Sequence, residues 1–138
     1  MEITIKFDKL QKTNDGKLED RKTIELGSNY SKWFNDTCKL WVSDSYYNRI
    51  FLVRAEGYAN DLLRANGYVF LNQVYEMLGI PKTKAGQIVG WVYDEKNPIG
   101  DNYIDFGLMN KYNSDFINGF TKDALLNFNV DGCILDRI

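Results

Sequence analysis

One long segment, from Ser45 to about Ala65, constrains the fold of this chain more than any other feature. Its apolar residues recur at three- and four-residue spacing, which is the pattern of a helix with one face turned to a core. Asp44 is a suitable N-cap, and Asn66-Gly67 supplies the left-handed residue that commonly ends a helix. The predicted inward stripe of this helix is Tyr47, Phe51, Ala55, Tyr58, Ala59, Leu62 and Leu63.

A second, shorter helix is predicted from Asn72 to Leu78, and Gly79 and Pro81 end it. A brief extended segment, residues 68–70, joins the two helices. Gly57 lies inside the long helix, where glycine costs about 1 kcal/mol relative to alanine. We therefore expect a neighbouring element to pack closely against it.

The remaining segments favour strands joined by turns, with a short helical stretch over residues 30–35. Alternation of apolar and polar residues is the pattern of a half-buried strand, and β-branched and aromatic residues add to it. The predicted strands cover residues 2–7, 22–26, 38–42, 87–93, 103–106, 125–129 and 133–135. The expected hairpins join 2–7 to 22–26, 87–93 to 103–106 and 125–129 to 133–135.

Together these elements predict one domain of the α+β class. The chain has 138 residues, close to the usual size of one domain, and 44% of them are hydrophobic, which is enough for a buried core. No repeat or linker divides it. We therefore predict a single α+β domain over residues 1–138, in which an antiparallel sheet packs with one long and one short central helix.

The net charge and the hydropathy of the chain indicate its cellular location and the class of partner that it binds. The net charge is −2, from 17 Lys and Arg against 19 Asp and Glu, so direct nucleic-acid binding is not the leading expectation. The N-terminus lacks the basic and apolar regions of a signal peptide. No apolar run approaches the roughly 20 residues that span a bilayer. We expect a soluble, cytoplasmic protein without a membrane partner.

The chain contains no histidine, which excludes most familiar reactive centres. Ser-His-Asp and Cys-His catalysis and imidazole zinc sites all need that side chain. Cys38 and Cys133 are the two cysteines, too few for a structural zinc site, which takes four ligands. No phosphate-cradling glycine loop is present. We therefore expect a protein that is not an enzyme and that holds no metal or cofactor.

Carboxylates are the remaining candidates for chemistry, and they gather around residues 94–102. An EF-hand alignment of this loop fails, because Ile99 and Phe106 stand where oxygen ligands are required. Asp101 and Asp105 as a paired acid and base would need one buried carboxyl beside an ionised one, whereas the strand pattern turns Asp105 outward. We interpret the loop as a solvated turn.

Acidic residues nevertheless dominate the C-terminal third. From Asp94 onward the chain has four Lys and Arg against eight Asp and Glu, and an acidic surface attracts a basic partner. The alternative is a face that is simply solvated. The candidate partner-binding residues are Asp94, Glu95, Asp101, Asp105, Asp131 and Asp136.

The long predicted helix carries tyrosines beside arginine, which suggests another binding surface. Arg54 is spaced to neighbour Tyr47 or Tyr58. Such residues stack nucleobases in single-strand binders, and they also dominate the hot spots of protein interfaces. The same face could pair two copies in a two-fold dimer. Burial in the core or at its rim is the plain alternative.

Two stretches of the C-terminal half carry a resemblance. Residues 67–108, GYVFLNQVYEMLGIPKTKAGQIVGWVYDEKNPIGDNYIDFGL, and residues 126–138, LNFNVDGCILDRI, resemble a family of short uncharacterised proteins from phages and mobile elements of low-GC Gram-positive bacteria. The resemblance brings no assigned chemistry, so no functional residue is transferred. It implies a mobile-element context, in which small non-enzymatic proteins often act by occupying a host protein.

These observations predict a non-enzymatic protein-binding module of phage or mobile-element origin. The specific expectation is an inhibitor of a host defence nuclease, of the anti-CRISPR kind, whose acidic C-terminal surface covers a basic nucleic-acid channel. The alternative is a nucleic-acid-binding accessory protein of a mobile element that uses the aromatic long helix.

Overall fold

The structure is a computed structural model that describes residues 30–138, so the hairpin predicted over residues 2–7 and 22–26 lies outside the described residues. Residues 32–138 form one structural unit with both helices and antiparallel strands, which confirms the α+β class. The single domain predicted over residues 1–138 reaches beyond this unit and stays a prediction. The elements are β2 Lys32–Phe34, α3 Ser45–Asn66, β3 Tyr68–Phe70, α4 Leu71–Leu78, the 3-10 helix η1 Ala85–Gln87, β4 Val89–Val92, the 3-10 helix η2 Lys111–Asn113, α5 Ser114–Ile117, β5 Ala124–Leu126 and β6 Gly132–Cys133.

The long predicted helix is confirmed as α3, with the ends expected from its caps. The side chain of Asp44 accepts hydrogen bonds from the backbone N–H groups of Tyr46 (2.9 Å) and Tyr47 (3.2 Å), which satisfies two of the free donors of the first turn. At the other end Gly67 has a left-handed φ of 86° and donates its N–H to the carbonyl of Leu63. No helix within residues 30–138 is both long enough and apolar enough to cross a membrane.

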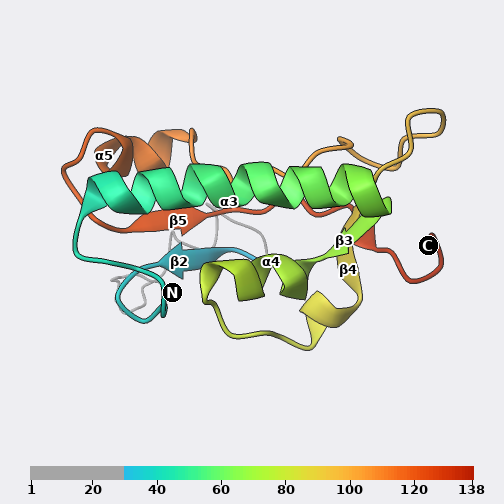
Figure 1. The fold of residues 1–138 in the computed structure, drawn as a ribbon, viewed down its shortest axis with the longest axis horizontal. Helices are drawn as coiled ribbons and strands as arrows, with labels where there is room; N and C mark the ends of the chain where they lie inside the picture. The colour runs from blue at the N-terminus through green and yellow to red at the C-terminus, as the bar shows by residue number, and fades with distance from the viewer. Residues whose placement is uncertain (1–29) are drawn as a thin grey trace. The chain divides into compact units, whose positions relative to one another are not determined.

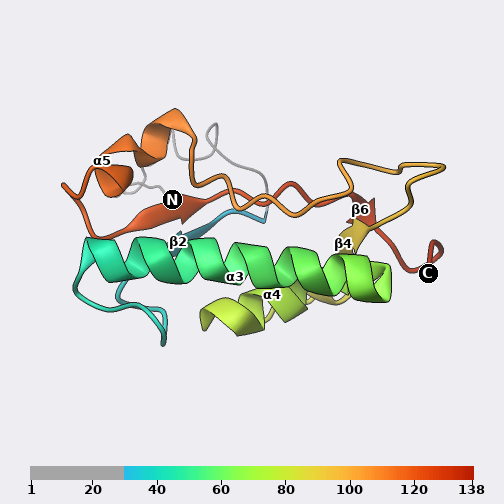
Figure 2. The same ribbon diagram turned by 45° about the horizontal axis from the view of Figure 1, so that its top comes forward.

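α3 connects two small antiparallel sheets (Figure 1). Near the beginning of the helix β2 pairs with β5, so that Phe34 lies opposite Ala124. Near its end the second sheet has the strand order β3–β4–β6. α4 runs along the middle of α3 (Figure 2). The stacked rings of Phe34 and Phe51, with centroids 5.7 Å apart, join the first sheet to the helix.

The short predicted helix is confirmed as α4, which begins one residue earlier than expected. The side chain of Gln73 accepts a hydrogen bond from the backbone N–H of Phe70 (2.8 Å) and so secures the first turn. Gly79 ends the helix with a φ of 73°. The extended segment before it is also confirmed, as β3. The largest side chains buried beneath these elements are Trp91, Tyr75, Phe34, Phe106, Phe116, Leu52, Leu63, Leu71 and Leu78.

The helical stretch predicted over residues 30–35 is wrong, because residues 32–34 form β2. The partner of this strand is β5, far along the chain, with Lys32 opposite Leu126. A pairing between segments so distant in sequence leaves no local signal. It outweighs the weak local preference of a short polar stretch for helix.

The strand predicted over residues 38–42 is also wrong, because this segment is a series of turns. The N–H of Cys38 donates to the carbonyl of Asn35, and the N–H of Trp41 donates to the carbonyl of Cys38. The side chain of Asn35 also accepts from the N–H of Thr37 (3.1 Å). Local hydrogen bonds of this kind compete with a strand ladder and here replace it.

Both predicted hairpins of the described C-terminal half are wrong in their partners. β4 pairs with β3 and β6 instead of residues 103–106, which form no strand. β5 pairs with β2, and β6 pairs with β4 through Cys133 opposite Val89. The turn predicted at residues 130–132 is therefore absent, because residues 127–131 join two sheets without regular structure and Gly132 already belongs to β6.

Asparagine side chains hold the segments that lack regular structure. Asn60 on α3 donates to the carbonyl of Ile104 (2.9 Å) and accepts from its N–H (2.7 Å), so its amide pairs with the backbone as a neighbouring strand would. Asn129 likewise accepts from the N–H of Asp105 and donates to the carbonyl of Tyr103. These side-chain bonds satisfy backbone groups of Tyr103, Ile104 and Asp105. The carbonyls of Asp105 and Phe106 accept instead from the backbone N–H groups of Asn129 and Asn127. Further two-way pairings join Asn48 to Val42, Asn72 to Thr83 and Asn113 to Leu125.

Among residues 30–138 the close neighbour predicted for Gly57 is absent. Gly57 is exposed, and a Cβ placed there would meet nothing within 4 Å. Its cost in the helix is therefore not offset by packing against any described residue.

We predict that Gly57→Ala raises the free energy of unfolding by about 0.5–1 kcal/mol, because alanine lowers the entropy of the unfolded chain and fits the helix. Chemical denaturation followed by circular dichroism measures this. Gly67→Ala is the matched control, and it should destabilise the protein because the φ at that position is 86°. A Gly57→Ala variant less stable than the parent would contradict the open space beside this residue.

Candidate functional site

The face of α3 that contacts the core agrees only in part with the predicted stripe, since Ala59 and Leu63 are buried as predicted. The stripe predicts that Tyr47 and Tyr58 point inward, but they are 63% and 59% exposed, so the prediction is wrong for them. A helix turns about 100° per residue, so residues one position further along the chain lie on an adjacent face of the helix. Asn48 and Leu52, each one position after Tyr47 and Phe51 of the predicted stripe, are buried in this way. The buried side chains of α3 are Asn48, Leu52, Ala59 and Leu63.

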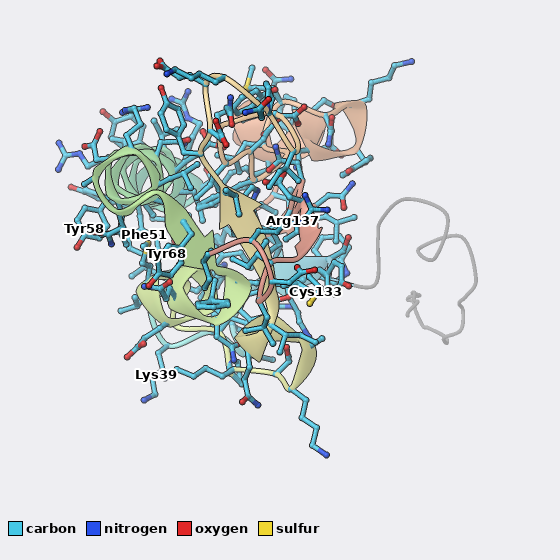
Figure 3. All side chains as sticks on the ribbon, turned by 90° about the vertical axis from the view of Figure 1, so that its right-hand side faces the viewer. Lys39, Phe51, Tyr58, Tyr68, Cys133 and Arg137 are labelled. Carbon is cyan, nitrogen blue, oxygen red and sulfur yellow. The ribbon has the colours of Figure 1, made fainter. Side chains whose placement is uncertain are left out.

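The misassigned tyrosines line an open groove of about 530 Å³ between α3 and α4. Ile50, Phe51 and Ala55 are half-buried and form its floor. The groove is lined by Tyr47, Ile50, Phe51, Arg54, Ala55, Tyr58 and Met77. Figure 3 shows Phe51 and Tyr58 on the side of the molecule where α3 lies beside α4, away from Cys133.

The groove is held in shape by the core beneath it. Phe51 stacks on the fully buried Phe34 with an interplanar angle of 22°. At the N-terminal end of α3, Tyr46 and Tyr47 meet edge to face with centroids 5.8 Å apart. Asp44 accepts from the backbone N–H groups of both tyrosines, which fixes the backbone that carries this aromatic pair.

The charge at the groove is positive. Arg54 is exposed and forms no ion pair with any residue from 30 to 138. Arg49 lies over the ring of Tyr46, 5.9 Å from its centroid, which is a cation–π arrangement. The arrangement of apolar floor, tyrosine rim and exposed guanidinium favours an apolar group that has a carboxylate next to it.

Of the six acidic residues predicted to bind a partner, Asp101 and Asp131 are brought together. Gly100 packs against the Asp131 carboxylate so closely that it leaves no room for a side chain. Burial is the main cause that raises the pKa of Asp131, and the charge of Asp101 adds to it. A hydrogen bond from the N–H of Val92 (2.9 Å) opposes the rise.

Asp94 and Asp105 serve the chain's own turns. Asp94 accepts from the N–H groups of Lys96 (3.1 Å) and Asn97 (3.0 Å), which is the hydrogen bonding of an Asx-turn. Asp105 accepts from the N–H of Gly107 (2.7 Å). Both carboxylates therefore stabilise the local backbone, whatever else they contact.

The other acidic candidates lie nearer to solvent. Glu95 accepts from the hydroxyl of Tyr93 (2.9 Å), and this hydrogen bond is the main cause that raises the pKa of Tyr93. Asp136 lies 3.7 Å from the guanidinium of Arg137. Glu95, Asp101 and Asp136 are exposed. Their predicted role in partner binding stays a prediction.

Asp101 and Asp105 do not meet as an acid and base pair would. Asn129 lies between them, donating to the Asp101 carboxylate (3.0 Å) and accepting from the backbone N–H of Asp105 (2.7 Å). Within the described part of the chain no three Cys, Asp or Glu side chains are placed to bind a metal ion. Cys38 is buried and Cys133 exposed, and both are free thiols.

The sequence analysis does not single out Glu56 on α3, a titratable residue that the structure places against an irregular segment. Its carboxylate accepts a hydrogen bond from the N–H of Phe106 (2.8 Å), and it is half-buried. Burial is the main cause that raises the pKa of Glu56, and the charge of Asp105 adds to the rise, while the bond from Phe106 opposes it. No spacing rule links these residues, because the contact joins a helix to an irregular segment.

Glu56 makes stability depend on pH. Because its pKa is raised in the folded chain, the folded state holds this proton more tightly, and stability falls as pH rises from the ordinary glutamate pKa through the raised one. We predict that Glu56→Gln flattens this part of the profile and stabilises the chain at neutral pH, by less than about 1 kcal/mol because the group is half in water. The glutamine oxygen can still accept from Phe106.

Urea unfolding at several pH values tests this prediction. Asp115→Asn is the control, since Asp115 is an exposed acidic residue in another helix, α5, and its profile should follow the parent. An unchanged pH profile in Glu56→Gln would contradict the proposed cause.

A comparison with known proteins places the chain in a wider group. One family model, described as a family of unknown function (DUF6353), matches residues 2–138. No curated protein and no solved structure matches the chain. The family match thus covers almost the whole length, including the N-terminal residues outside the earlier resemblance.

Proposed function

We propose that this chain, which belongs to the family of unknown function DUF6353, is a protein-binding module whose α3–α4 groove takes an apolar segment of a partner. The observation that carries the proposal is the groove itself, with its apolar floor and with Tyr47, Arg54 and Tyr58 exposed around it. Tyrosine and arginine are enriched among the residues that contribute most to protein interfaces. An exposed apolar patch with a polar rim is typical of such a site.

The chemistry of the groove selects the partner. Apolar side chains of the partner fill the floor formed by Ile50, Phe51 and Ala55, and a carboxylate of the partner next to them pairs with the guanidinium of Arg54. Arginine binds carboxylates with two parallel hydrogen bonds, which adds geometric selectivity. We therefore propose an acidic segment with one or two large apolar anchors.

A second copy of the chain fits this groove less well. In a two-fold contact the same patch meets itself, which brings Arg54 of one copy towards Arg54 of the other. Like charges close together at an interface cost free energy. Dimerisation through the same face would therefore need an acidic residue in the groove, and the described lining has none.

Selection of peptides from a displayed random library tests the proposal on the full chain. We expect enriched peptides to share an aromatic or branched aliphatic anchor with Asp or Glu within a few positions. Arg54→Glu should shift the enriched charge from acidic to basic, while Lys111→Glu, an exposed charge reversal on η2, should not. The double variant Tyr47→Ala/Tyr58→Ala should weaken binding of a selected peptide about tenfold or more. The groove is not the peptide-binding site if the selected peptides share no consensus. The same conclusion follows if Arg54→Glu leaves the charge of the selected peptides unchanged.

A narrower proposal concerns the identity of the partner. The partner would be a host defence nuclease, and the chain, of phage or mobile-element origin, would inhibit it. Glu95, Asp101 and Asp136, which are exposed, would face the basic channel of such an enzyme. Co-expression with candidate nucleases followed by pull-down tests this, and nuclease activity that is unaffected by excess chain counts against it.

Binding of single-stranded nucleic acid is the second candidate function. The observation that favours it is the pairing of Arg49 with the ring of Tyr46 beside the edge-to-face ring of Tyr47, because such groups stack bases and contact phosphate. Fluorescence anisotropy with labelled oligonucleotides should then show affinity that falls steeply with salt. Peptide binding without oligonucleotide binding would favour the first function.

A further inference from the structure

A second hollow, of about 390 Å³, lies beside the N-terminal end of α3 and shares no residue with the groove. It forms where the turns after β2 meet the segment that joins α5 to β5. Two aromatic rings, two carboxylates and one ammonium group line it. The lining residues are Asp36, Trp41, Phe120, Thr121, Lys122 and Asp123.

The two walls of this hollow are tied together at one carbonyl group. The indole N–H of Trp41 donates to the carbonyl of Lys122 (3.0 Å), and the side-chain amide of the buried Asn48 donates to the same oxygen (3.0 Å). Asn48 also pairs with both backbone groups of Val42. The ring of Trp41 is therefore held in place before any ligand binds.

The charges around the hollow favour a cation. Burial is the main cause that raises the pKa of Asp123, and the charge of Asp36 adds to it, while Trp41 and Lys122 oppose the rise. The ammonium of Lys122 donates a hydrogen bond to the hydroxyl of Ser43 (2.8 Å). One of its three donors is therefore occupied by Ser43, a residue outside the lining of the hollow. Asp36 forms no ion pair with another residue of the described chain. A positive group between the two carboxylates would relieve their repulsion.

The aromatic rings that line the hollow favour an organic cation over a metal ion. Phe120 is 81% exposed, and it lines the hollow together with the half-buried Trp41. Aromatic faces attract cations that carry apolar or planar surface, and together with carboxylates they recognise methylated ammonium and guanidinium groups. Ca²⁺ and Mg²⁺ prefer six or more oxygen ligands, of which two carboxylates supply only a part.

We propose that this hollow binds an organic cation of the alkylammonium or guanidinium type, with the charge between Asp36 and Asp123 and the apolar surface between Trp41 and Phe120. This binding site goes beyond the proposed function and does not depend on the α3–α4 groove. The cation is either a free quaternary amine or a basic side chain of another protein, and the two share the same recognition chemistry.

Titration of the full chain, followed by the indole N–H cross-peak of Trp41 in proton–nitrogen NMR spectra, tests the proposal. The probes are tetramethylammonium chloride and N-acetyl-arginine amide, with sodium chloride at equal ionic strength as the reference. We expect a saturable shift with a dissociation constant on the order of millimolar. Stronger binding of the quaternary amine favours a free ligand, and stronger binding of the arginine derivative favours a protein side chain.

Substitutions of exposed residues keep the test separate from folding. Phe120→Ala and Asp36→Asn should each weaken binding about three- to fivefold, whereas Asp115→Asn, an exposed acidic residue of α5 outside the lining, should leave it unchanged. The proposal is overturned if neither cation gives a saturable shift beyond the sodium chloride reference. It is equally overturned if the shift persists undiminished in both Phe120→Ala and Asp36→Asn.

Discussion

Gly90→Ala is expected to lower the free energy of unfolding by about 3 kcal/mol or more. Gly90 lies in β4 opposite Phe70 of β3, where the two backbones approach closely. A Cβ on this residue would collide with the carbonyl oxygen of Val69 and lie 2.9 Å from the Cα of Phe70. These are backbone atoms, which have no alternative rotamer, so the strands must separate to admit the methyl group.

Denaturant unfolding of Gly90→Ala and Gly57→Ala provides a matched comparison. The chemical change is identical, but the space at Gly57 is open, so one variant should be strongly destabilised and the other slightly stabilised. If the first variant is too unstable to purify, its yield and its hydrogen exchange in a cell lysate replace the unfolding curve. A Gly90→Ala variant with parental stability would show that β3 and β4 do not pair as described.

Asn113→Ala is the second substitution expected to destabilise the chain strongly, by about 3 kcal/mol. Asn113 is only 1% exposed. It donates to the carbonyls of Gly107 (2.9 Å) and Leu125 (2.9 Å) and accepts from the N–H of Leu125 (2.8 Å). Alanine leaves the N–H and the carbonyl of Leu125 without this partner in a buried place, and an unsatisfied buried group costs about 1–3 kcal/mol. The carbonyl of Gly107 keeps a hydrogen bond from the N–H of Asn110 (3.2 Å).

Thermal and urea unfolding measure this effect, with Asn118→Ala as the control because Asn118 is exposed at the end of α5. Asn113→Asp tests the donor separately. It keeps an acceptor for the N–H of Leu125 but loses both donated bonds and introduces a buried charge, so it should also be strongly destabilising. Equal stability of the Asn113 and Asn118 variants would contradict the role of this side chain.

The helices could be predicted because their information is local. In α3 the cap at Asp44, the apolar spacing and Gly67 act within a few turns of one another, so the predicted ends agree with the structure. The same holds for α4 with Gly79. What the spacing could not decide is which of two adjacent rows faces the core. The face of α3 that is buried depends on the sheets packed against the helix. With those sheets in place, Tyr47 and Tyr58 lie at the surface.

The candidate sites also combine features that are visible in the sequence with contacts that depend on the tertiary structure. The acidic residues around Asp101 were visible in the sequence as composition, yet their contacts with Asn129 and with one another depend on segments far apart. The α3–α4 groove needs both helices, and the hollow beside Trp41 needs two loops separated by most of the described chain.

The sequence by itself determined the elements whose stabilising contacts lie within a few residues: the two helices, their caps and the extended segment between them. It also determined the absence of imidazole from the whole chain. Only the tertiary structure decided the strand partners, the buried face of α3 and the asparagine pairings with irregular backbone. A hydrogen bond or a packing contact between distant residues depends on where the chain returns, and no local spacing records that position.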